Sequence, residues 1–369
     1  MARMTKNLPF LLVDISKCEQ NIAFMASKAS KANVLLRPHF KTHQSLAVGE
    51  LFRKYGIQQI TVSSVAMAEY FSSSGWGDIT IAFPFVPQMA ARICTLARNI
   101  ELNVIFSSPQ NLLASIGSID AKLGAFIEVD VGQGRTGVAV ENTRDIALMI
   151  NLIASNRNVT FKGFLTHAGN SYGVKGKDAV LKVHTNALNQ LAKLRSFWAN
   201  QFPNLIISYG DTPTCSLADE FWGLNEIRPG NFVFYDVMQS LIGSCNLSQV
   251  AVALICPVVD VSPNLQKVVF HGGAVHLSKE KVEIDGNDCY GVVCRFDGVT
   301  WSNPVPNALV SALSQEHGII SYTNGALDDV KPGDLLAILP VHSCLAVDCM
   351  GQMFDAHGNK YDVLPKNAR

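Results

Sequence analysis

The chain has 369 residues, of which 48% are apolar and 16% charged, with 30 basic and 30 acidic residues. A chain of this length and composition can bury one large core and a smaller second one. The balanced charge gives no electrostatic reason to expect nucleic acid or an anionic membrane as a partner, so we expect a soluble protein without either.

The first residues hold only a short apolar run, Leu8–Val13, which is too short for the core of a secretory signal. The nine cysteines are scattered without the spacing of a disulfide framework, which predicts reduced thiols and a cytoplasmic protein. The stretch Ser240–Asp260 approaches the length of a membrane span. Its β-branched residues and Pro257 favour a buried strand instead.

Between residues 30 and 240, short apolar runs alternate with stretches such as QSLAVGELFRKYG, whose apolar residues recur at helical spacing. The predicted strands are Val34–His39, Ile60–Ser63, Asp78–Phe83, Asn103–Ser107, Ala125–Asp130, Phe161–Thr166, Leu205–Tyr209 and Asn231–Tyr235. Eight strands alternating with helices predict an α/β fold, a (β/α)8 TIM barrel, over residues 15–240. A doubly wound open sheet is the competing prediction, because alternation alone does not prove closure.

Beyond residue 240 the helical period disappears. The segments AVALICPVVDVS, KVVFHGGAVHLS, YGVVCRF, IISY and LLAILP are β-rich and are separated by Gly, Pro and Asn. We therefore predict a second, β-rich domain over residues 241–369. The segment PFLLVDI near the N-terminus would add a strand to it from residues 1–14.

The first predicted strand runs into RPHFKTHQS and delivers Lys41 to its carboxyl end, where barrel enzymes keep their catalytic residues. Arg37, His39 and His43 would crowd positive charge around this amine, lower its pKa and leave part of it neutral and nucleophilic. A neutral lysine at the mouth of a barrel suits Schiff-base chemistry with pyridoxal phosphate (PLP). The alternative is a surface lysine that happens to follow a strand.

A phosphate site would support PLP, and LIISYGDTPTCS offers one. It supplies a strand, Gly210, the hydroxyls of Thr212 and Thr214, and the start of a helix. An ordinary N-capped turn between strand and helix fits the same residues. In EIRPGNFVFYD, Gly230 and Asn231 would bring backbone close to the same phosphate.

The segment DVGQGRTG has the GxGxxG spacing of a dinucleotide-binding loop. Such a loop opens the first βαβ unit and is followed by an acidic residue about twenty positions later. Here the segment follows the fifth predicted strand, and NLIASNRN at that distance has no acidic residue. We reject a dinucleotide site. Arg135 would instead face the ring of a ligand or form a structural salt bridge.

In LPVHSCLAVDCMG, His342 and Cys344 alternate in a predicted strand, so their side chains would face the same side. Imidazole and thiolate are standard zinc ligands, and two protein ligands leave positions open for water or substrate. The spacing alone favours the plainer alternative of a buried cysteine beside a hydrogen-bonded histidine.

Together these segments resemble one family. RPHFKTHQS closely resembles the RPHxKTH signature of the D-serine dehydratase and D-threonine aldolase family, which has the alanine-racemase-like fold of type III PLP enzymes. EVDVGQGRTGV, THAGNSYG, YGDTPTCS, EIRPGNFVFYD and PVHSC resemble further blocks of that family, in the same order and over most of the chain. The resemblance implies a PLP-binding barrel, a β-domain built from both chain ends, and a homodimer.

The resemblance also implies site residues. Lys41 would bind PLP as a Schiff base and act as the catalytic residue. The residues expected around PLP are His39, Arg135, His167, Tyr172, Thr212, Gly230 and Asn231, of which the last three would hold its phosphate. His342 and Cys344 would bind a divalent metal, and the thiolate ligand favours zinc.

Two departures from the family predict a different substrate pocket. Leu165 stands where family dehydratases can show a tyrosine, and FHGGAVHLS adds His271 and His276 to the corresponding segment.

The expected reaction is metal-assisted β-elimination from a D-3-hydroxy amino acid such as D-serine, which yields a 2-oxo acid and ammonia. Lys41 would take the Cα proton, and the metal would polarise the hydroxide leaving group. Retro-aldol cleavage would use the same parts, and racemisation would not need the metal. A PLP carrier without turnover is the fourth alternative, but it would need neither the β-domain nor the His342–Cys344 pair.

Overall fold

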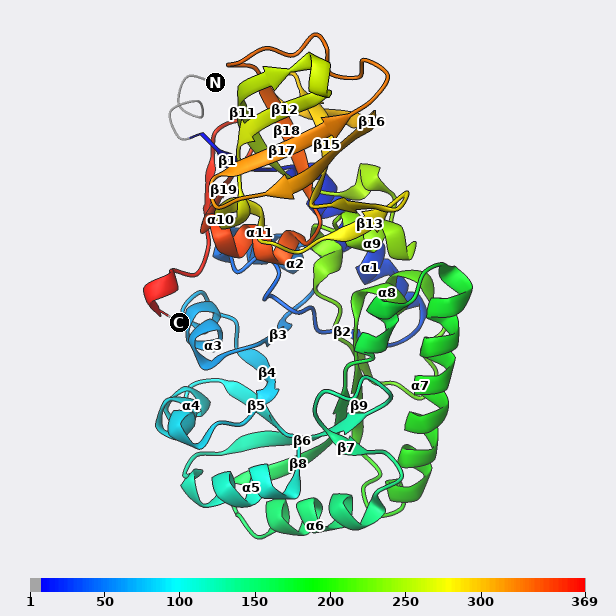
Figure 1. The fold of residues 1–369 in the computed structure, drawn as a ribbon. Coiled ribbons are helices and arrows are strands. Elements are labelled where there is room, and N and C mark those ends of the chain that lie inside the picture. Colours follow the sequence, from blue (N-terminus) through cyan, green and yellow to red (C-terminus); the bar gives the residue numbers. More distant parts are fainter. Residues whose placement is uncertain (1–7, 369) are drawn as a thin grey trace. The chain divides into compact units, whose positions relative to one another are not determined.

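The structure is a computed structural model that describes residues 8–368. The chain forms two compact units, whose elements are labelled in Figure 1. The barrel unit comprises Ala23–Lys41, Phe52–Gly230 and the C-terminal residues from Asn367. The β unit comprises the N-terminal segment up to Ile22, Thr42–Leu51 and Asn231–Lys366. Each unit is therefore assembled from separate stretches of the chain.

In the described part of the barrel unit, eight parallel strands follow one another in sequence order. They are β2 (Leu35–Leu36), β3 (Gln59–Val62), β4 (Asp78–Pro84), β5 (Glu101–Phe106), β6 (Leu123–Asp130), β8 (Val159–Thr166), β9 (Ile206–Tyr209) and β10 (Glu226–Ile227). β2 pairs with β10 on one side, and a parallel bridge from His39 to Thr61 links the segment after β2 to β3. The circle closes, so the predicted barrel is confirmed and the open sheet is excluded.

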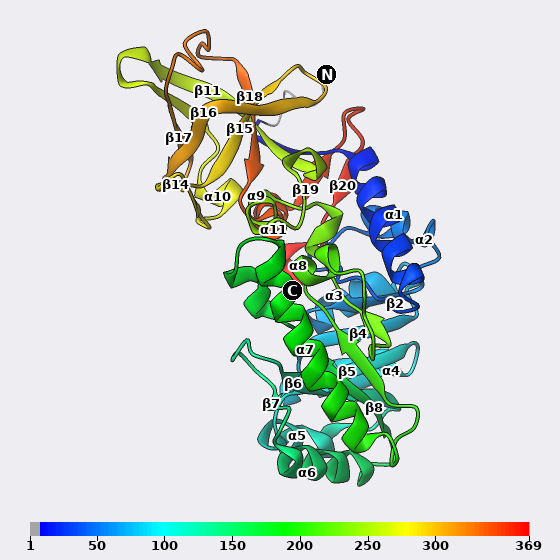
Figure 2. The same ribbon diagram turned by 90° about the vertical axis from the view of Figure 1, so that its right-hand side faces the viewer.

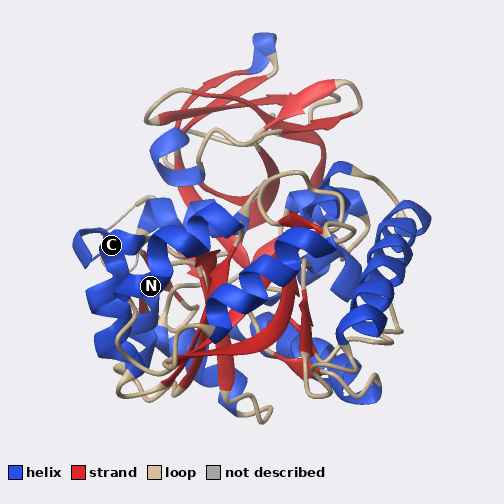
Figure 3. Cartoon of the chain, turned by 90° about the horizontal axis from the view of Figure 1, so that it is seen from below, coloured by secondary structure: helices blue, strands red, loops and turns tan. Residues whose placement is uncertain are grey.

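Helices surround these strands (Figure 3). They are α1 (Ile15–Lys31), α3 (Val65–Ser72), α4 (Ala90–Ala97), α5 (Pro109–Ser115), α6 (Thr143–Ala154), α7 (Lys177–Trp198) and α8 (Thr212–Leu217). On α6, the buried residues Ile146, Met149, Ile150 and Ile153 recur at three- and four-residue spacing, so one face of this helix is apolar and buried. Inside the barrel unit, Ile105, Phe126 and Leu165 of three neighbouring strands form one apolar cluster.

One glycine allows two barrel strands to approach each other closely. Gly163 in β8 has a φ of +140°, and a Cβ atom there would lie 2.0 Å from the carbonyl oxygen of Ile206 in β9. The pairing of β8 with β6 also shifts register at this level of the barrel. A glycine is required here for both reasons, since any side chain would meet backbone in a strained conformation.

The prediction of the eighth strand at Asn231–Tyr235 is wrong. The strand is Glu226–Ile227, and Asn231–Val233 form a 3-10 turn (η5) that leads to α9 (Val237–Ile242). Buried apolar runs of this length do not distinguish strand from turn by their pattern. The true strand was missed because it carries the buried Glu226, whose carboxylate accepts a hydrogen bond of 2.9 Å from Arg37.

The β unit contains a ring of six antiparallel strands, five of which are labelled in Figure 2. In ring order they are β12 (Lys267–His271), β17 (His317–Tyr322), β16 (Trp301–Leu313), β15 (Gly291–Phe296), β18 (Leu335–Pro340) and β11 (Val252–Ser262). β11 pairs again with β12, so these strands form a small antiparallel barrel. The second, β-rich part of the chain is confirmed.

Further elements complete the β unit. They are β1 (Phe10–Val13), α2 (Leu46–Arg53), α10 (Ala274–Leu277), β13 (Val282–Ile284), β14 (Asn287–Cys289), α11 (Ser343–Met350), β19 (Gln352–Phe354) and β20 (Lys360–Asp362). β1 pairs antiparallel with β11, with Phe10 opposite Ile255, and parallel with β19. β1 thus joins an N-terminal strand to the sheet of this unit. Within residues 8–368, every helix is too short or too polar to span a membrane.

Candidate active site

Lys41 is exposed at the end of the segment that follows β2, and a buried aromatic cluster anchors this segment. The ring of Phe40 packs against the rings of Phe52, Phe71 and Trp76, with centroid distances of 4.9, 5.0 and 5.0 Å. Aromatic pairs at these separations are favourable beyond the area they bury. The backbone that carries Lys41 is therefore held firmly while its side chain reaches the surface of the barrel unit.

The charges expected to crowd Lys41 are mostly compensated. Arg37 is buried and donates to Glu226 at 2.9 Å and to Asp78 at 2.6 Å, so its charge is paired. His43, in the β unit, is fully buried, and burial lowers its pKa to about 3, which leaves it neutral at ordinary pH. The prediction that Arg37 and His43 place free positive charge beside Lys41 is wrong. His39 does lie beside it, since its Nδ1 is 3.4 Å from the backbone nitrogen of Lys41.

His167 follows β8, and the charges of several cationic side chains of the barrel unit act on its imidazole. Burial, together with the charges of Lys41, Arg135 and Arg228, lowers the pKa of His167 to about 3. Its Nδ1 lies 2.5 Å from the carbonyl oxygen of Gly210. A carbonyl can only accept, so Nδ1 carries the proton of the neutral ring and Nε2 is left as an acceptor.

The segment after β9 contains Gly210, Asp211 and Thr212. A Cβ atom at Gly210 would lie 2.8 Å from backbone atoms of Arg228, so only glycine permits this close approach. Asp211 caps α8 by accepting a hydrogen bond of 2.7 Å from the backbone nitrogen of Thr214. The turn is thus N-capped, and both the phosphate-binding and the plain-turn interpretation require such a cap.

Thr212 has a buried hydroxyl with no hydrogen-bond partner among residues 8–368. Its backbone nitrogen donates to the hydroxyl of Tyr172 at 3.3 Å, and the ring of Tyr172 lies 6.1 Å from that of His167. Burying a hydroxyl without a partner costs free energy, and a bound ligand would remove that cost. The Thr212 hydroxyl is therefore placed to bind something that the chain itself does not supply.

Arg228 is a candidate site residue that sequence reasoning missed. It is fully buried after β10 and donates to the carbonyl oxygen of Thr166 at 2.6 Å and to the Ser208 hydroxyl. Burial lowers the pKa of Arg228 to about 10, so it still carries its charge at ordinary pH. Its position directly after Glu226–Ile227 was the available signal, since a charged residue in an apolar stretch points to a buried polar network.

The DVGQGRTG loop is organised by its own carboxylate. Asp130 accepts hydrogen bonds of 3.0, 2.8 and 2.9 Å from the backbone nitrogens of Gly132, Gln133 and Gly134. These are the N–H groups that a dinucleotide phosphate would need, which agrees with our rejection of such a site. Arg135 is exposed, and its charge acts on the buried carboxyl of Glu128 and on the imidazole of His167.

In the β unit, His342 and Cys344 do not lie on a strand, so this prediction is wrong. β18 ends at Pro340, and His342 occupies the cap position of α11, whose first turn holds Cys344. The helix starts here because Asp236, far away in the sequence, accepts a hydrogen bond of 3.0 Å from the backbone nitrogen of Ser343. The two predicted ligands meet through a helix start and not through strand alternation.

Polar partners prepare this pair for metal binding. His342 Nδ1 lies 2.8 Å from a carboxylate oxygen of Glu280, and Cys344 Sγ lies 3.3 Å from the Thr42 hydroxyl. Burial opposes the charged forms, but hydrogen bonds with Cys344 and Glu280 outweigh it and raise the pKa of His342 to about 11. Burial likewise opposes a Cys344 thiolate, yet the hydrogen bond and charge of His342 lower the pKa of this thiol.

These residues fit a divalent metal of the zinc class. A carboxylate on Nδ1 fixes the ring of His342 and leaves Nε2 for an ion, which is the usual surrounding of a metal-binding histidine. A thiolate beside an imidazole is a donor set that zinc favours. The sequence did not predict that Glu280 and Thr42 contact the two metal-ligand candidates. The only sign of Glu280 was its place in the tripeptide SKE, directly after FHGGAVHL.

The barrel unit likewise fits an anionic cofactor. Contacts and charge interactions link Lys41, Arg135, His167, Tyr172, Thr212 and Arg228. Positive charge and a buried hydroxyl without a partner suit a phosphate better than a neutral ligand. Gly230 is the last residue of the main barrel stretch.

Asn231 opens the β unit's largest stretch. It donates to Asp236 at 2.6 Å and to the Ser343 hydroxyl at 3.1 Å, and its amide oxygen is buried without a partner among the described residues. The β unit thus brings together Asn231, His342 and Cys344, three of the predicted site residues, and a ligand could satisfy the remaining amide oxygen.

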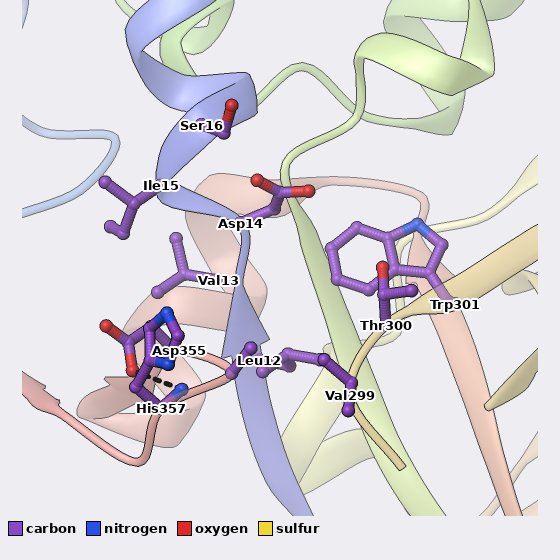
Figure 4. Close-up of a pocket in the computed structure, with 11 residues that line it drawn as sticks. Leu12, Val13, Asp14, Ile15, Ser16, Val299, Thr300, Trp301, Asp355 and His357 are labelled. Carbon is purple, nitrogen blue, oxygen red and sulfur yellow. Dashed lines mark hydrogen bonds between the residues drawn. The ribbon is translucent and has the colours of Figure 1, made fainter. Parts of the chain in front are cut away.

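A pocket of about 210 Å³ in the β unit holds none of the predicted site residues (Figure 4). It is formed by Leu12–Ser16, Val299–Trp301 and Asp355–His357. A carboxylate oxygen of Asp355 accepts a hydrogen bond of 2.9 Å from the backbone nitrogen of His357. The carboxylate of Asp355 is therefore engaged in its own turn.

Known proteins resemble this chain over nearly its whole length. It is 28% identical over 353 residues to D-threo-3-hydroxyaspartate dehydratase of Delftia sp. (strain HT23), with 92% of each chain covered. It is 28% identical over 371 residues to the D-serine dehydratase of Dictyostelium discoideum, covering 92% of this chain and 90% of the relative. The solved structure of the Delftia enzyme superposes with a TM-score of 0.88 at 25% identity, covering 97% of both chains. A cysteine-to-alanine variant of that enzyme, solved in a metal-free form, superposes equally well.

Two family models match. The serine dehydratase domain matches residues 251–355, within the β unit. The alanine racemase N-terminal domain matches residues 13–237, more than half of the chain. The chain therefore belongs to the family with an alanine racemase N-terminal domain, joined here to a serine dehydratase domain.

Proposed function

We propose that this protein is a PLP- and metal-dependent lyase that converts a D-3-hydroxy amino acid, such as D-serine, to a 2-oxo acid and ammonia. The observation that carries the proposal is the His342–Cys344 pair with Glu280 on the imidazole, because a racemase or a carrier needs no such pair. The two dehydratases that are 28% identical support the same reaction class. The related dehydratase with a cysteine replaced by alanine, solved in a metal-free form, supports a cysteine ligand.

The chemistry that PLP would supply is electron withdrawal from the substrate Cα, and a zinc-class metal would supply polarisation of the departing hydroxyl. Lys41 would hold the cofactor and then accept the Cα proton at Nζ. The charges of Arg135, Arg228 and Lys41 all act on the imidazole of His167, so the two arginines would favour the uncharged amine when Lys41 is released during turnover.

The other residues of the proposed site would bind and orient. Thr212 would donate its buried hydroxyl to the phosphate. The backbone of Gly230 and Asn231 would complete that contact. His167, neutral and protonated at Nδ1, would accept a hydrogen bond at Nε2 without adding a charge. His39 and Tyr172 would flank the cofactor.

His342 and Cys344 would hold the metal, and Glu280 would keep the imidazole in the orientation that presents Nε2. The Thr42 hydroxyl contacts Cys344, and Thr42 is the residue after Lys41 in the chain. Because Lys41 is bonded to the residue that contacts Cys344, we infer that the Lys41 amine and the metal act on the same substrate.

The deciding experiment is a product analysis. PLP-loaded protein is incubated with D-serine, D-threonine and D-threo-3-hydroxyaspartate, with and without chelator, and the products are followed by proton NMR in heavy water. A 2-oxo acid and ammonia that disappear with chelator are the expected result. Glycine plus an aldehyde would make the protein an aldolase. Exchange of the α-proton together with formation of the L-enantiomer, measured by chiral chromatography, would make it a racemase. Unchanged substrates would leave a carrier. L-serine is the control.

Replacement of His342 tests the metal role directly. We expect His342→Ala to keep the PLP absorbance and to lose oxo-acid formation by at least about 100-fold, because hydroxide is a poor leaving group without the metal. His317→Gln, an exposed histidine of the same unit, is the matched control and should retain full activity. Full activity in His342→Ala would show that this residue binds no catalytic metal.

A further inference from the structure

A second group of ligand-type side chains lies in the β unit, apart from the His342–Cys344 pair. His271, His276 and Glu316 each present one ligand atom, and these atoms lie within 4.8 Å of one another. His271 Nε2 is 3.5 Å from a carboxylate oxygen of Glu316, and the two imidazole centroids are 5.4 Å apart. Both histidines belong to the FHGGAVHLS segment that departs from the family pattern, so the proposed function leaves them without a role.

The backbone holds these side chains together. His271 ends β12, His276 lies on α10, and Glu316 lies in the turn between β16 and β17. The backbone nitrogen of Gly272 donates to the carbonyl oxygen of Glu316 at 2.9 Å. The backbone nitrogen of Ala274 donates to the carbonyl oxygen of Ser314 at 2.8 Å. The three ligand atoms are therefore brought near each other by hydrogen bonds that do not involve the side chains.

A glycine allows this contact. A Cβ atom at Gly273 would lie 2.4 Å from the carbonyl oxygen of Gln315 and 2.5 Å from that of Ser314. Only a residue without a side chain lets the segment after β12 approach the turn so closely. The close approach of the two backbone segments that carry the cluster is thus built into the local fold.

One ring nitrogen of the cluster is left unsatisfied. Nδ1 of His276 is buried and has no hydrogen-bond partner among residues 8–368. An ion pair between His271 and Glu316 would explain those two residues but would leave this nitrogen unpaired, at a cost of free energy. The side chains of His271 and Glu316 are 40% and 47% exposed, so a ligand can reach the cluster from solution.

We propose that His271, His276 and Glu316 bind a second divalent transition-metal ion, with zinc the preferred ion. Two imidazoles and a carboxylate form a three-ligand set for zinc, with a fourth position open to water. Calcium and magnesium are disfavoured because they require mostly oxygen ligands. Zinc bonds of about 2.1 Å place tetrahedral ligands about 3.4 Å apart, so closure around the ion needs side-chain shifts of about 1 Å. The exposed Glu316 can make such a shift.

The test counts metal and does not depend on turnover. Metal-stripped protein is loaded with excess zinc, passed through a desalting column and measured by plasma mass spectrometry. We expect about two zinc ions per chain in the wild type and about one in His276→Ala, in Glu316→Gln and in His342→Ala. The double variant His276→Ala/His342→Ala should hold none. His317→Gln, the cross-strand neighbour of His271, is the control and should match the wild type.

The variants separate this inference from the proposed function. A zinc content in both His276→Ala and Glu316→Gln equal to that of the wild type overturns the second site, whatever His342→Ala does. Loss of zinc in these two variants supports it even if His342→Ala binds as much zinc as the wild type, which would instead refute the proposed catalytic metal. Because Glu316 is exposed, Glu316→Gln carries the test if His276→Ala does not fold.

Discussion

Asp211 is the buried carboxyl group on which the turn after β9 depends. Besides capping α8, it accepts hydrogen bonds of 2.9 Å from the Ser171 hydroxyl and 2.6 Å from the Thr214 hydroxyl. Burial nevertheless raises the pKa of Asp211 to about 6, because the desolvation of a charged carboxylate outweighs these bonds. The residue that shapes the proposed phosphate turn is thus also a source of pH-dependent stability.

The sign of this effect follows from proton linkage. An unfolded aspartate titrates near pH 3.9, so between about pH 4 and 6 the folded protein holds a proton that the unfolded chain has lost. The contribution of Asp211 to the unfolding free energy is full below pH 4 and is lost as the pH rises through 6. Over that window it should decrease by roughly 3 kcal/mol relative to Asp211→Asn, which cannot titrate.

Denaturant titrations of both proteins between pH 4 and 7 measure this difference. Asp178→Asn, at an exposed position of α7, controls for the general effect of removing a carboxylate. A wild-type minus Asp211→Asn difference that stays flat from pH 4 to 6 would mean that Asp211 is not a carboxyl with a raised pKa.

At the scale of elements, the sequence predicted a strand well where consecutive residues of the strand are mostly apolar. It failed where a strand depends on a polar contact with a residue far away in the sequence. Strands such as Asp78–Pro84 and Val159–Thr166 are rich in apolar and β-branched residues and lie between helices, close to where they were predicted. β10 was missed because Glu226 is buried opposite Arg37, which lies 189 positions earlier. A pattern read along the chain contains no information about such a partner.

The predicted metal pair illustrates the same limit. The residue types of His342 and Cys344 indicated metal chemistry, but their spacing indicated a strand, whereas the residues form the start of α11. What decides between the two is the Asp236 carboxylate, which accepts from the Ser343 backbone across 107 positions of sequence. Composition could therefore identify the candidate ligands, and only the fold could show how they meet.

Gly163 offers a prediction at the scale of a strand pair. In Gly163→Ala the new methyl group would meet the backbone of Ile206 and force a strained φ, which should destabilise the barrel unit by about 3 kcal/mol. Gly77→Ala is the matched control, since a Cβ there meets nothing within 4 Å. That variant should be neutral or slightly more stable. Thermal and denaturant unfolding measure the stability of both variants. Equal stability of Gly163→Ala and Gly77→Ala would argue against the close β8–β9 contact.

At the scale of the whole molecule, the two units are stabilised by different strand pairings. The side chain of Leu11 in β1 is fully buried, and this residue pairs with Leu254 in β11. We expect Leu11→Ala to cost about 3 kcal/mol, through lost burial and the cavity it leaves. The loss should appear first in the β unit, because β1 belongs to that unit.

Amide hydrogen exchange can locate this loss. Protection should fall in β11 and β18, while β5 and β6 of the barrel unit keep theirs. Leu113→Ala, a mostly exposed position on α5, should leave both sets unchanged. An equal loss in β5 and β6 would show that the units do not open separately.

The β unit's assembly from distant stretches also has a consequence for biosynthesis. Most barrel strands pair with the strand made just before or after them, and only the β2–β10 pair joins distant parts of that unit's sequence. In the β unit, β1 is made some 240 residues before β11, its partner in the sheet. At bacterial or eukaryotic translation speeds, FLLV would wait on the order of tens of seconds without the strand that covers it. Chaperone capture of this nascent segment, or slowed elongation before residue 252, would therefore affect the yield of folded protein more than similar events within the barrel.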